Sequence, residues 1–200
     1  MYAQDDCLVI ADMKGMQDSF FYLQDSVLRR EIGSFNFIGS FLGKGGKAEL
    51  LRFEVSEFSR DRIILTHDTI SVFIGSTTFF PRMHQLEFNK EWNFLYRIDQ
   101  KPYWGIEGRV PHRRIAGVFL SFDNTNVSIP YRDYRDLFEP NLCRRTSLFG
   151  RLVCRSEAFM SEDGRRIYIY MRNGTIPSLY EVTWIIEDGE YIGRVVDFAY

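Results

Sequence analysis

The spacing of hydrophobic positions divides the chain into one helical segment near its start and a long region of strands. Over residues 14–32, Met16, Phe20, Leu23 and Val27 recur at three- and four-residue steps, which marks one apolar stripe along a helix. Two arginines and then a glycine close this segment, as is common where a helix ends. We therefore predict an amphipathic helix over about residues 14–32 that packs against a sheet.

Beyond this helix the hydrophobic pattern alternates every second residue, which is typical of strands. The alternating or strand-like runs are residues 49–58, 61–66, 70–74, 92–98, 114–122 and 126–129. The segment 81–91 fits either a short helix opened by Pro81 or the beginning of the following strand. Residues 131–138 fit one or two helical turns that end before a proline.

The C-terminal quarter of the chain has the most regular pattern. Asp-Gly pairs at 163–164 and 188–189 each separate two strand-like runs, and this dipeptide is a strong hairpin signal. We predict a four-stranded antiparallel meander over about residues 151–197. In its last hairpin a two-residue turn would place Ile186 opposite Tyr191 and Trp184 opposite Gly193, where the indole would cover the bare glycine backbone.

Composition supports a folded, sheet-rich protein. Hydrophobic residues make up 45% of the chain, charged residues 26% and aromatic residues 16%, and a high aromatic share favours sheet. No linker or repeat divides the sequence, so one domain over residues 1–200 is expected. The predicted fold class is α+β or mainly β: a curved antiparallel sheet forming a roll, barrel or sandwich, with the N-terminal helix packed on it. No run approaches the roughly 20 apolar residues of a membrane span.

The charge of the chain bears on its partners. The formal net charge is −2, which does not indicate a nucleic-acid or membrane-surface protein. Arginines are concentrated in the middle of the chain and could converge, with Trp104 as a stacking ring, on a surface for single-stranded nucleic acid or an acidic protein partner. These arginines are Arg109, Arg113, Arg114, Arg132, Arg135, Arg144 and Arg145. The alternative, which we favour, is dispersed arginines that each pair locally.

The cysteines exclude some classes of protein and leave others open. Cys7, Cys143 and Cys154 have no zinc-type spacing and are too few for a dense disulfide framework. Cys143 and Cys154 form one bridge if neighbouring strands bring them together, and are otherwise free thiols. No metal or cofactor is expected. No complete signal peptide is present, so the protein is either cytoplasmic or exported with its start as a mature N-terminus.

No catalytic motif is present, so candidate catalytic residues rest on residue type alone. His67 could act as a general base oriented by Asp68, and His112 lies in a loop with positive neighbours. The leading hypothesis is a non-catalytic binding or interaction protein, such as a bacterial accessory or immunity protein, with another protein as its partner. The alternative is a carrier or enzyme that takes a small apolar ligand in a cavity of a cupped sheet, with either His67 and Asp68 or His112 at its mouth.

Overall fold

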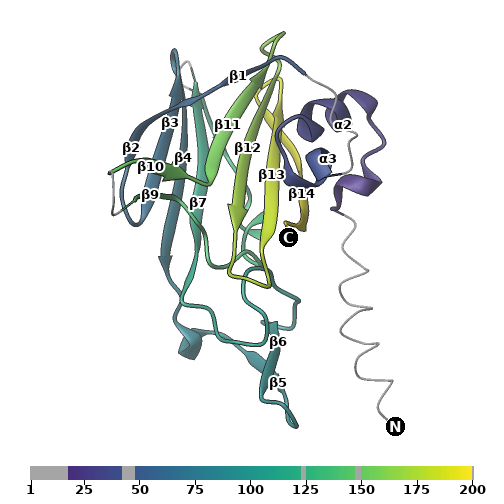
Figure 1. The fold of residues 1–200 in the computed structure, drawn as a ribbon, viewed down its shortest axis with the longest axis vertical. Coiled ribbons are helices and arrows are strands. Elements are labelled where there is room, and N and C mark those ends of the chain that lie inside the picture. Colours follow the sequence, from purple (N-terminus) through teal and green to yellow (C-terminus); the bar gives the residue numbers. More distant parts are fainter. Residues whose placement is uncertain (1–17, 42–47, 123–124, 147–149, 200) are drawn as a thin grey trace.

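A computed structural model describes residues 18–41, 48–122, 125–146 and 150–199. Two five-stranded antiparallel sheets face each other (Figure 1), with the strand orders β1-β11-β12-β13-β14 in sheet A and β2-β3-β4-β7-β8 in sheet B. The predicted antiparallel, mainly-β or α+β class is confirmed, and among the three forms considered the arrangement is sandwich-like.

Apart from β1, the strands of sheet B come from the first part of the chain and those of sheet A from the last part. Sheet A consists of β1 (Leu50–Arg52), β11 (Ser156–Ser161), β12 (Arg166–Asn173), β13 (Tyr180–Glu187) and β14 (Glu190–Phe198). Sheet B consists of β2 (Glu54–Phe58), β3 (Arg62–His67), β4 (Ile70–Thr78), β7 (Arg113–Phe122) and β8 (Thr125–Ser128). Strands β1 and β2 form one nearly continuous segment, so the chain crosses from sheet A to sheet B at a single corner residue, Phe53.

One hydrophobic cluster fills the space between the sheets. Sheet B contributes alternate residues such as Ile63 and Leu65, and sheet A contributes Ile169, Val182 and Trp184, all of them buried. The period of two places every second side chain of a strand on the same face. The alternation in the sequence is therefore the direct cause of this shared core.

Strands β11 to β14 form an antiparallel meander, in which one predicted register is kept and another changes. Ile186 lies opposite Tyr191, as predicted, but an irregularity between Ile185 and Ile186 shifts the pairing by one residue. Trp184 therefore lies opposite Arg194, and Ile185, not Trp184, lies opposite Gly193. The expected indole–glycine pair is wrong because a β-bulge adds a residue to one strand, which hairpin counting from the turn does not include.

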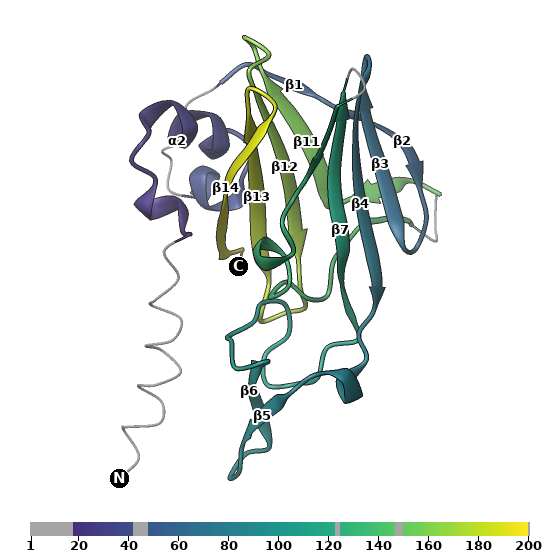
Figure 2. The same ribbon diagram turned by 180° about the vertical axis from the view of Figure 1, so that it is seen from behind.

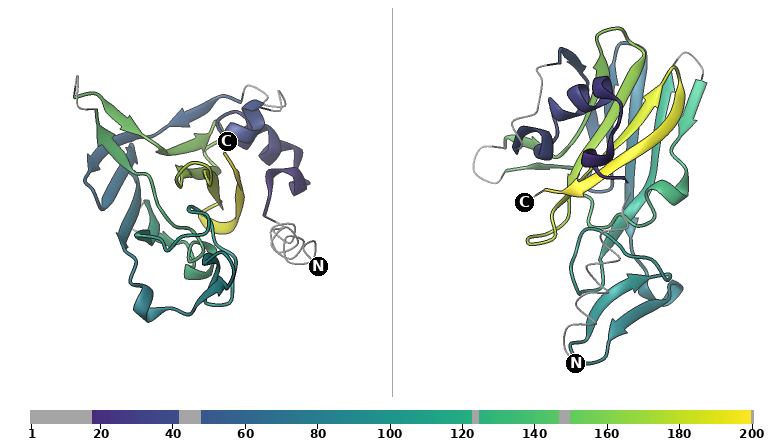
Figure 3. Two further views of the ribbon diagram at one scale, coloured as in Figure 1. Left: turned by 60° about the horizontal axis from the view of Figure 1, so that its bottom comes forward. Right: turned by 90° about the vertical axis from the view of Figure 1, so that its right-hand side faces the viewer.

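A helical layer covers the outer face of sheet A (Figure 3). It consists of the 3₁₀-helix η1 (Phe20–Tyr22) and the α-helices α2 (Ser26–Gly33) and α3 (Phe37–Phe41). Phe20 and Ile32 from this layer pack with Tyr168, Tyr170 and Ile185 of the sheet.

The helical layer differs from the single helix expected over residues 14–32, of which residues 14–17 lie outside the described ranges. The break between η1 and α2 has a local cause. The Asp25 carboxylate accepts hydrogen bonds from the N–H groups of Val27, at 2.7 Å, and Leu28, at 3.1 Å, and so caps a new helix there. The apolar stripe is real, but polar capping groups inside it divide it.

Two buried carboxylates of sheet A hold this layer. Glu181 accepts hydrogen bonds from the N–H groups of Phe37 and Ile38 and from the hydroxyl of Tyr170, at 2.7–2.9 Å. Asp197, its cross-strand neighbour, accepts from the N–H of Phe20 at 2.8 Å. Burial raises the pKa of both carboxyls above the usual range, although these hydrogen bonds oppose the shift.

The raised pKa of Glu181 predicts a pH dependence of stability. Because the folded state holds this proton more tightly than the unfolded chain does, the stabilisation is complete below the unfolded pKa near about 4 and is lost as the pH rises through the folded pKa. We therefore expect Glu181→Gln to show a smaller gain in unfolding free energy than the wild type when the pH falls from neutral to about 5. Urea unfolding at several pH values measures this difference, with Glu190→Gln, exposed at the start of β14, as the control. Parallel pH profiles for wild type and Glu181→Gln would contradict the prediction.

Two smaller hairpins lie outside the sheets. An arm formed by β5 (Leu86–Asn89) and β6 (Phe94–Ile98) extends away from the sandwich (Figure 2), and η2 (Pro81–Met83) precedes it. Of the two alternatives for segment 81–91, the short helix opened by Pro81 is present, whereas residues 86–89 form a separate strand that pairs antiparallel with β6 and do not begin it. A two-stranded ribbon, β9 (Cys143–Arg145) with β10 (Leu152–Cys154), lies beside β2 (Figure 1). The 3₁₀-helix η3 (Tyr131–Asp133) is the helical turn expected after residue 130. Among the described helices, none has the length and apolar character needed to cross a membrane.

Candidate functional site

A groove with a volume of about 500 Å³ opens where the edges of the two sheets diverge, beside the β9–β10 ribbon. We call it the ribbon groove. Its lining residues are Arg52, Phe53, Val55, Leu65, Thr146, Arg151, Leu152, Val153, Cys154, Ser156 and Glu157. Sheet A, sheet B and the ribbon all contribute to this set, so no single segment of the sequence contains the site.

The wall formed by β1 and β2 follows from the chain crossing between the sheets. Phe53 is buried at the corner, and its N–H donates to the carbonyl of Ala158 at 2.9 Å, which holds the crossing against β11. Val55 pairs with Leu65 of β3 in the ladder of sheet B. The apolar part of this wall is therefore fixed by core packing and by sheet hydrogen bonds.

The opposite wall is the ribbon, which a disulfide closes. Cys143 lies directly opposite Cys154 in the ladder, and their sulfurs are bonded. Of the two alternatives that the sequence left open for these cysteines, the structure has the bridge; Cys7 lies outside the described residues. The guanidinium of Arg145 lies 5.4 Å from the ring centroid of Phe58 on β2, which places the ribbon against sheet B.

The charge of the groove is carried by three side chains. Arg52 forms an ion pair with Glu157, across β1 and β11. Arg151 has no ion-pair partner among the residues that the structure describes. The lining therefore has two positive charges and one negative charge, and the ribbon adds Arg144 and Arg145 nearby.

The candidate catalytic residues do not come together. The Nε2 of His67 lies 3.6 Å from Oδ2 of the exposed Asp68, at the turn between β3 and β4. His112 directly precedes β7, and its Nδ1 lies 3.5 Å from Oε1 of Glu139. The first pair lies at the beginning of β4 and the second beside its end, and a nine-residue strand spans roughly 26 Å between its first and last Cα atoms at about 3.3 Å per residue. His67 and His112 therefore cannot share one site.

The set of arginines considered for a shared surface is spread over several elements of the structure. Three of its members have local partners: Arg113 bonds Asp61, Arg114 bonds the hydroxyl of Tyr131, and Arg132 bonds Asp133. Trp104 is 5% exposed and packs on Phe198 in the core, so its ring is not at the surface to stack on a ligand. Arg109 is exposed near the β5–β6 arm, where the hydroxyl of Tyr103 donates to its carbonyl, and Arg135 is half-buried with its charge close to Asp99.

The arginines that the structure does bring together include two that sequence reasoning missed, Arg52 and Arg151. A signal for Arg151 was present, because residues 141–156 contain four arginines and no acidic residue between and beside two cysteines. Arg52 has no such signal, since it is about a hundred positions earlier in the chain and reaches the groove only through the pairing of β1 with β11.

A second arrangement missed from the sequence is a histidine–aspartate pair in the arm. The Nδ1 of His84 lies 2.7 Å from Oδ2 of Asp99, whose other oxygen accepts from the N–H of Gln85 at 2.9 Å. Burial by itself raises the pKa of Asp99. The hydrogen bonds from His84 and Gln85, together with nearby positive charge, outweigh this effect and lower the pKa below its usual value. These contacts join the beginning of β5 to the end of β6, which explains them as part of the arm's structure.

Two general tests bear on the chemistry of these sites. Within the described ranges, no three His, Cys, Asp or Glu side chains are grouped so that they could hold a metal ion. Comparisons of the chain with protein-family models, with curated proteins and with solved structures found no match.

Proposed function

We propose that this protein is a non-catalytic binding protein and that the ribbon groove is its binding site. The observation that carries the proposal is the groove itself: about 500 Å³, lined by both apolar and charged side chains. Sites for small ligands commonly are concave, mostly apolar and of about 300–1,000 Å³, with a few polar groups that orient the ligand. Neither His67 nor His112 is among the lining residues of the groove, which favours this function over an enzyme that uses one of these histidines there.

The occupant of the groove can be found by native mass spectrometry of the protein recovered gently from its own host. We expect an added mass of roughly a few hundred daltons, the size of a ligand that fits such a site. Val153→Trp, which fills the groove from the ribbon side, is expected to lose this added mass. Val27→Trp, at a half-buried valine of the helical layer, is the matched control and is expected to retain it.

A bare wild-type chain, or the same added mass on the wild type and on Val153→Trp, would contradict the proposal. Near-identical thermal unfolding midpoints for the two variants ensure that the comparison measures binding and not loss of the fold.

A second candidate is binding of another protein at the same place. The observation that favours it is the presence of edge strands: β2 and β10 each have one neighbouring strand in the described sheets. Such edges can accept an extended segment of a partner through backbone hydrogen bonds. In the same mass measurement, a second polypeptide in place of a small ligand, lost in Val153→Trp, would select this candidate.

A further inference from the structure

We propose that the ribbon groove binds a single-chain amphipathic anion, with its acidic head at Arg52 and Arg151 and its apolar tail along the sheet B wall. The inference rests on the proposed function and adds the chemical class of the ligand. It stands on the distribution of charged and apolar side chains in the groove.

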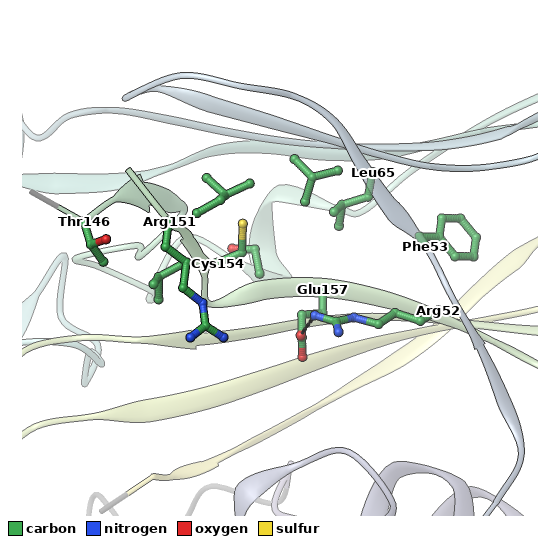
Figure 4. Close-up of a pocket in the computed structure, with 11 residues that line it drawn as sticks. Arg52, Phe53, Leu65, Thr146, Arg151, Cys154 and Glu157 are labelled. Atoms are coloured by element: carbon green, nitrogen blue, oxygen red, sulfur yellow. Dashed lines mark hydrogen bonds and ion pairs between the residues drawn. The ribbon is translucent and has the colours of Figure 1, made fainter. Parts of the chain in front are cut away.

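The two kinds of lining side chain are on different sides. Figure 4 shows the side chains of Arg52, Glu157 and Arg151 along one side of the groove and Leu65 on the opposite side. Phe53 and Val55 extend the apolar wall, and Leu152 and Val153 supply apolar groups from the ribbon. A ligand that satisfies both sides must itself have a polar end and an apolar end.

The sign of the polar end follows from the ion pairs. Glu157 is paired with Arg52, so its charge is already compensated. Arg151 is exposed and has no acidic partner in the part of the chain that the structure describes. The excess charge at the polar side is therefore positive, and a cationic head would be repelled there.

The geometry of guanidinium groups restricts which acidic group the ligand can carry as its head. A guanidinium is planar and donates two parallel hydrogen bonds, which suits a carboxylate. Because the three charged lining residues sum to one positive charge, a head with one negative charge balances them. A carboxylate on an unbranched apolar chain combines these requirements.

Isothermal titration calorimetry tests the inference by comparing decanoate with two probes, decanol and decyltrimethylammonium. Both have a ten-carbon chain but a neutral or a positive head. We expect decanoate to bind more tightly than decanol, and decyltrimethylammonium to bind least. Butanoate, which keeps the head and shortens the tail, is expected to bind more weakly than decanoate because it buries less apolar surface.

Two variants are expected to change the affinity for decanoate in opposite directions. Arg151→Glu is expected to weaken decanoate binding by roughly tenfold or more, through loss of a charge-assisted bond and added repulsion. Glu157→Gln is expected to strengthen it, because Arg52 is then released from its ion pair. Arg109→Glu, at an exposed arginine beside the β5–β6 arm, is the charge-matched control and is expected to bind as the wild type does.

The outcomes separate the inference from the proposed function. Equal binding of all three ten-carbon probes, or wild-type decanoate affinity in Arg151→Glu, would overturn the anionic class while leaving the groove as a binding site. Failure of all three probes to bind the wild type would overturn the inference and would count against the groove as a small-ligand site. Preferential binding of decanoate, with opposite effects of the two variants, would support it.

Discussion

Replacing Arg194 with alanine is expected to lower the free energy of unfolding by about 3–5 kcal/mol, the cost typical of breaking a buried ion pair. The guanidinium donates to both carboxylate oxygens of Asp136, at 2.7 and 2.8 Å, and its Nε donates to Asp18 at 2.9 Å. The Arg194 and Asp136 side chains are only 12% and 15% exposed. Alanine would leave the Asp136 carboxylate buried without its partner, and this uncompensated charge causes most of the loss.

Arg165 supplies the control, because it forms the same kind of two-bond ion pair but in a solvent-exposed position. Its guanidinium also donates to both oxygens of one carboxylate, that of Asp188, at 3.0 and 2.7 Å. The two side chains are 54% and 57% exposed, and exposed pairs of this kind contribute little to stability. Urea unfolding of both alanine variants should therefore give a large loss for Arg194 and a small one for Arg165. Equal losses would show that burial does not set the strength of these pairs.

The second large effect is expected at Trp184, for which alanine should cost about 3–5 kcal/mol, as large-to-small changes in a core do. Trp184 is completely buried on the inner face of sheet A, and its indole N–H donates to the carbonyl of Asp133 at 2.9 Å. Truncation therefore creates a cavity in the shared core and leaves a carbonyl with one fewer donor. Thermal or urea unfolding measures the loss.

Trp92 provides the matched control for this residue type. It lies in the turn between β5 and β6 and is 76% exposed. Trp92→Ala should change the unfolding free energy by no more than about 0.5 kcal/mol, as is usual for surface positions. If Trp92→Ala were as destabilising as Trp184→Ala, the arm rather than the sandwich core would dominate the stability of the fold.

The two large effects are connected through one backbone group. The carbonyl of Asp133 accepts from the indole of Trp184 and also from the guanidinium of Arg194, at 3.0 Å. Side chains that share a partner do not act independently. The double alanine variant should therefore lose less than the sum of the single losses.

Local sequence signals predicted the elements of this fold where side-chain period and turn chemistry act within a few residues. The alternation over residues 61–66 and 114–122 corresponds to β3 and β7, and the Asp-Gly turn at 188–189 joins β13 to β14. The prediction of an unbroken helix over residues 14–32 missed the Asp25 cap, because an aspartate in an apolar stripe can face solvent or cap a new helix. Only the backbone path decides between these two roles.

The candidate site was far less accessible from the sequence. The run of arginines around Cys143 and Cys154 can be recognised in the sequence, but the residues that lie beside it in the groove cannot. Arg52 and Leu65 reach it because β1 pairs with β11 and β2 pairs with β3. The partners of individual arginines were inaccessible for the same reason: Asp61, which pairs with Arg113, is more than fifty positions away in the chain.

The antiparallel, β-rich fold class could be predicted from the sequence, since hydrophobic period and hairpin turns act over distances of a few residues. The sequence also limited the fold to an antiparallel roll, barrel or sandwich with a helical segment outside it. Which strands share a sheet, where the bulge between β13 and β14 falls and which charges are paired emerged only from the three-dimensional packing. The physical reason is that strand pairing is non-local: the same alternating strand can form its ladder with several partners, and only packing of the whole core selects one.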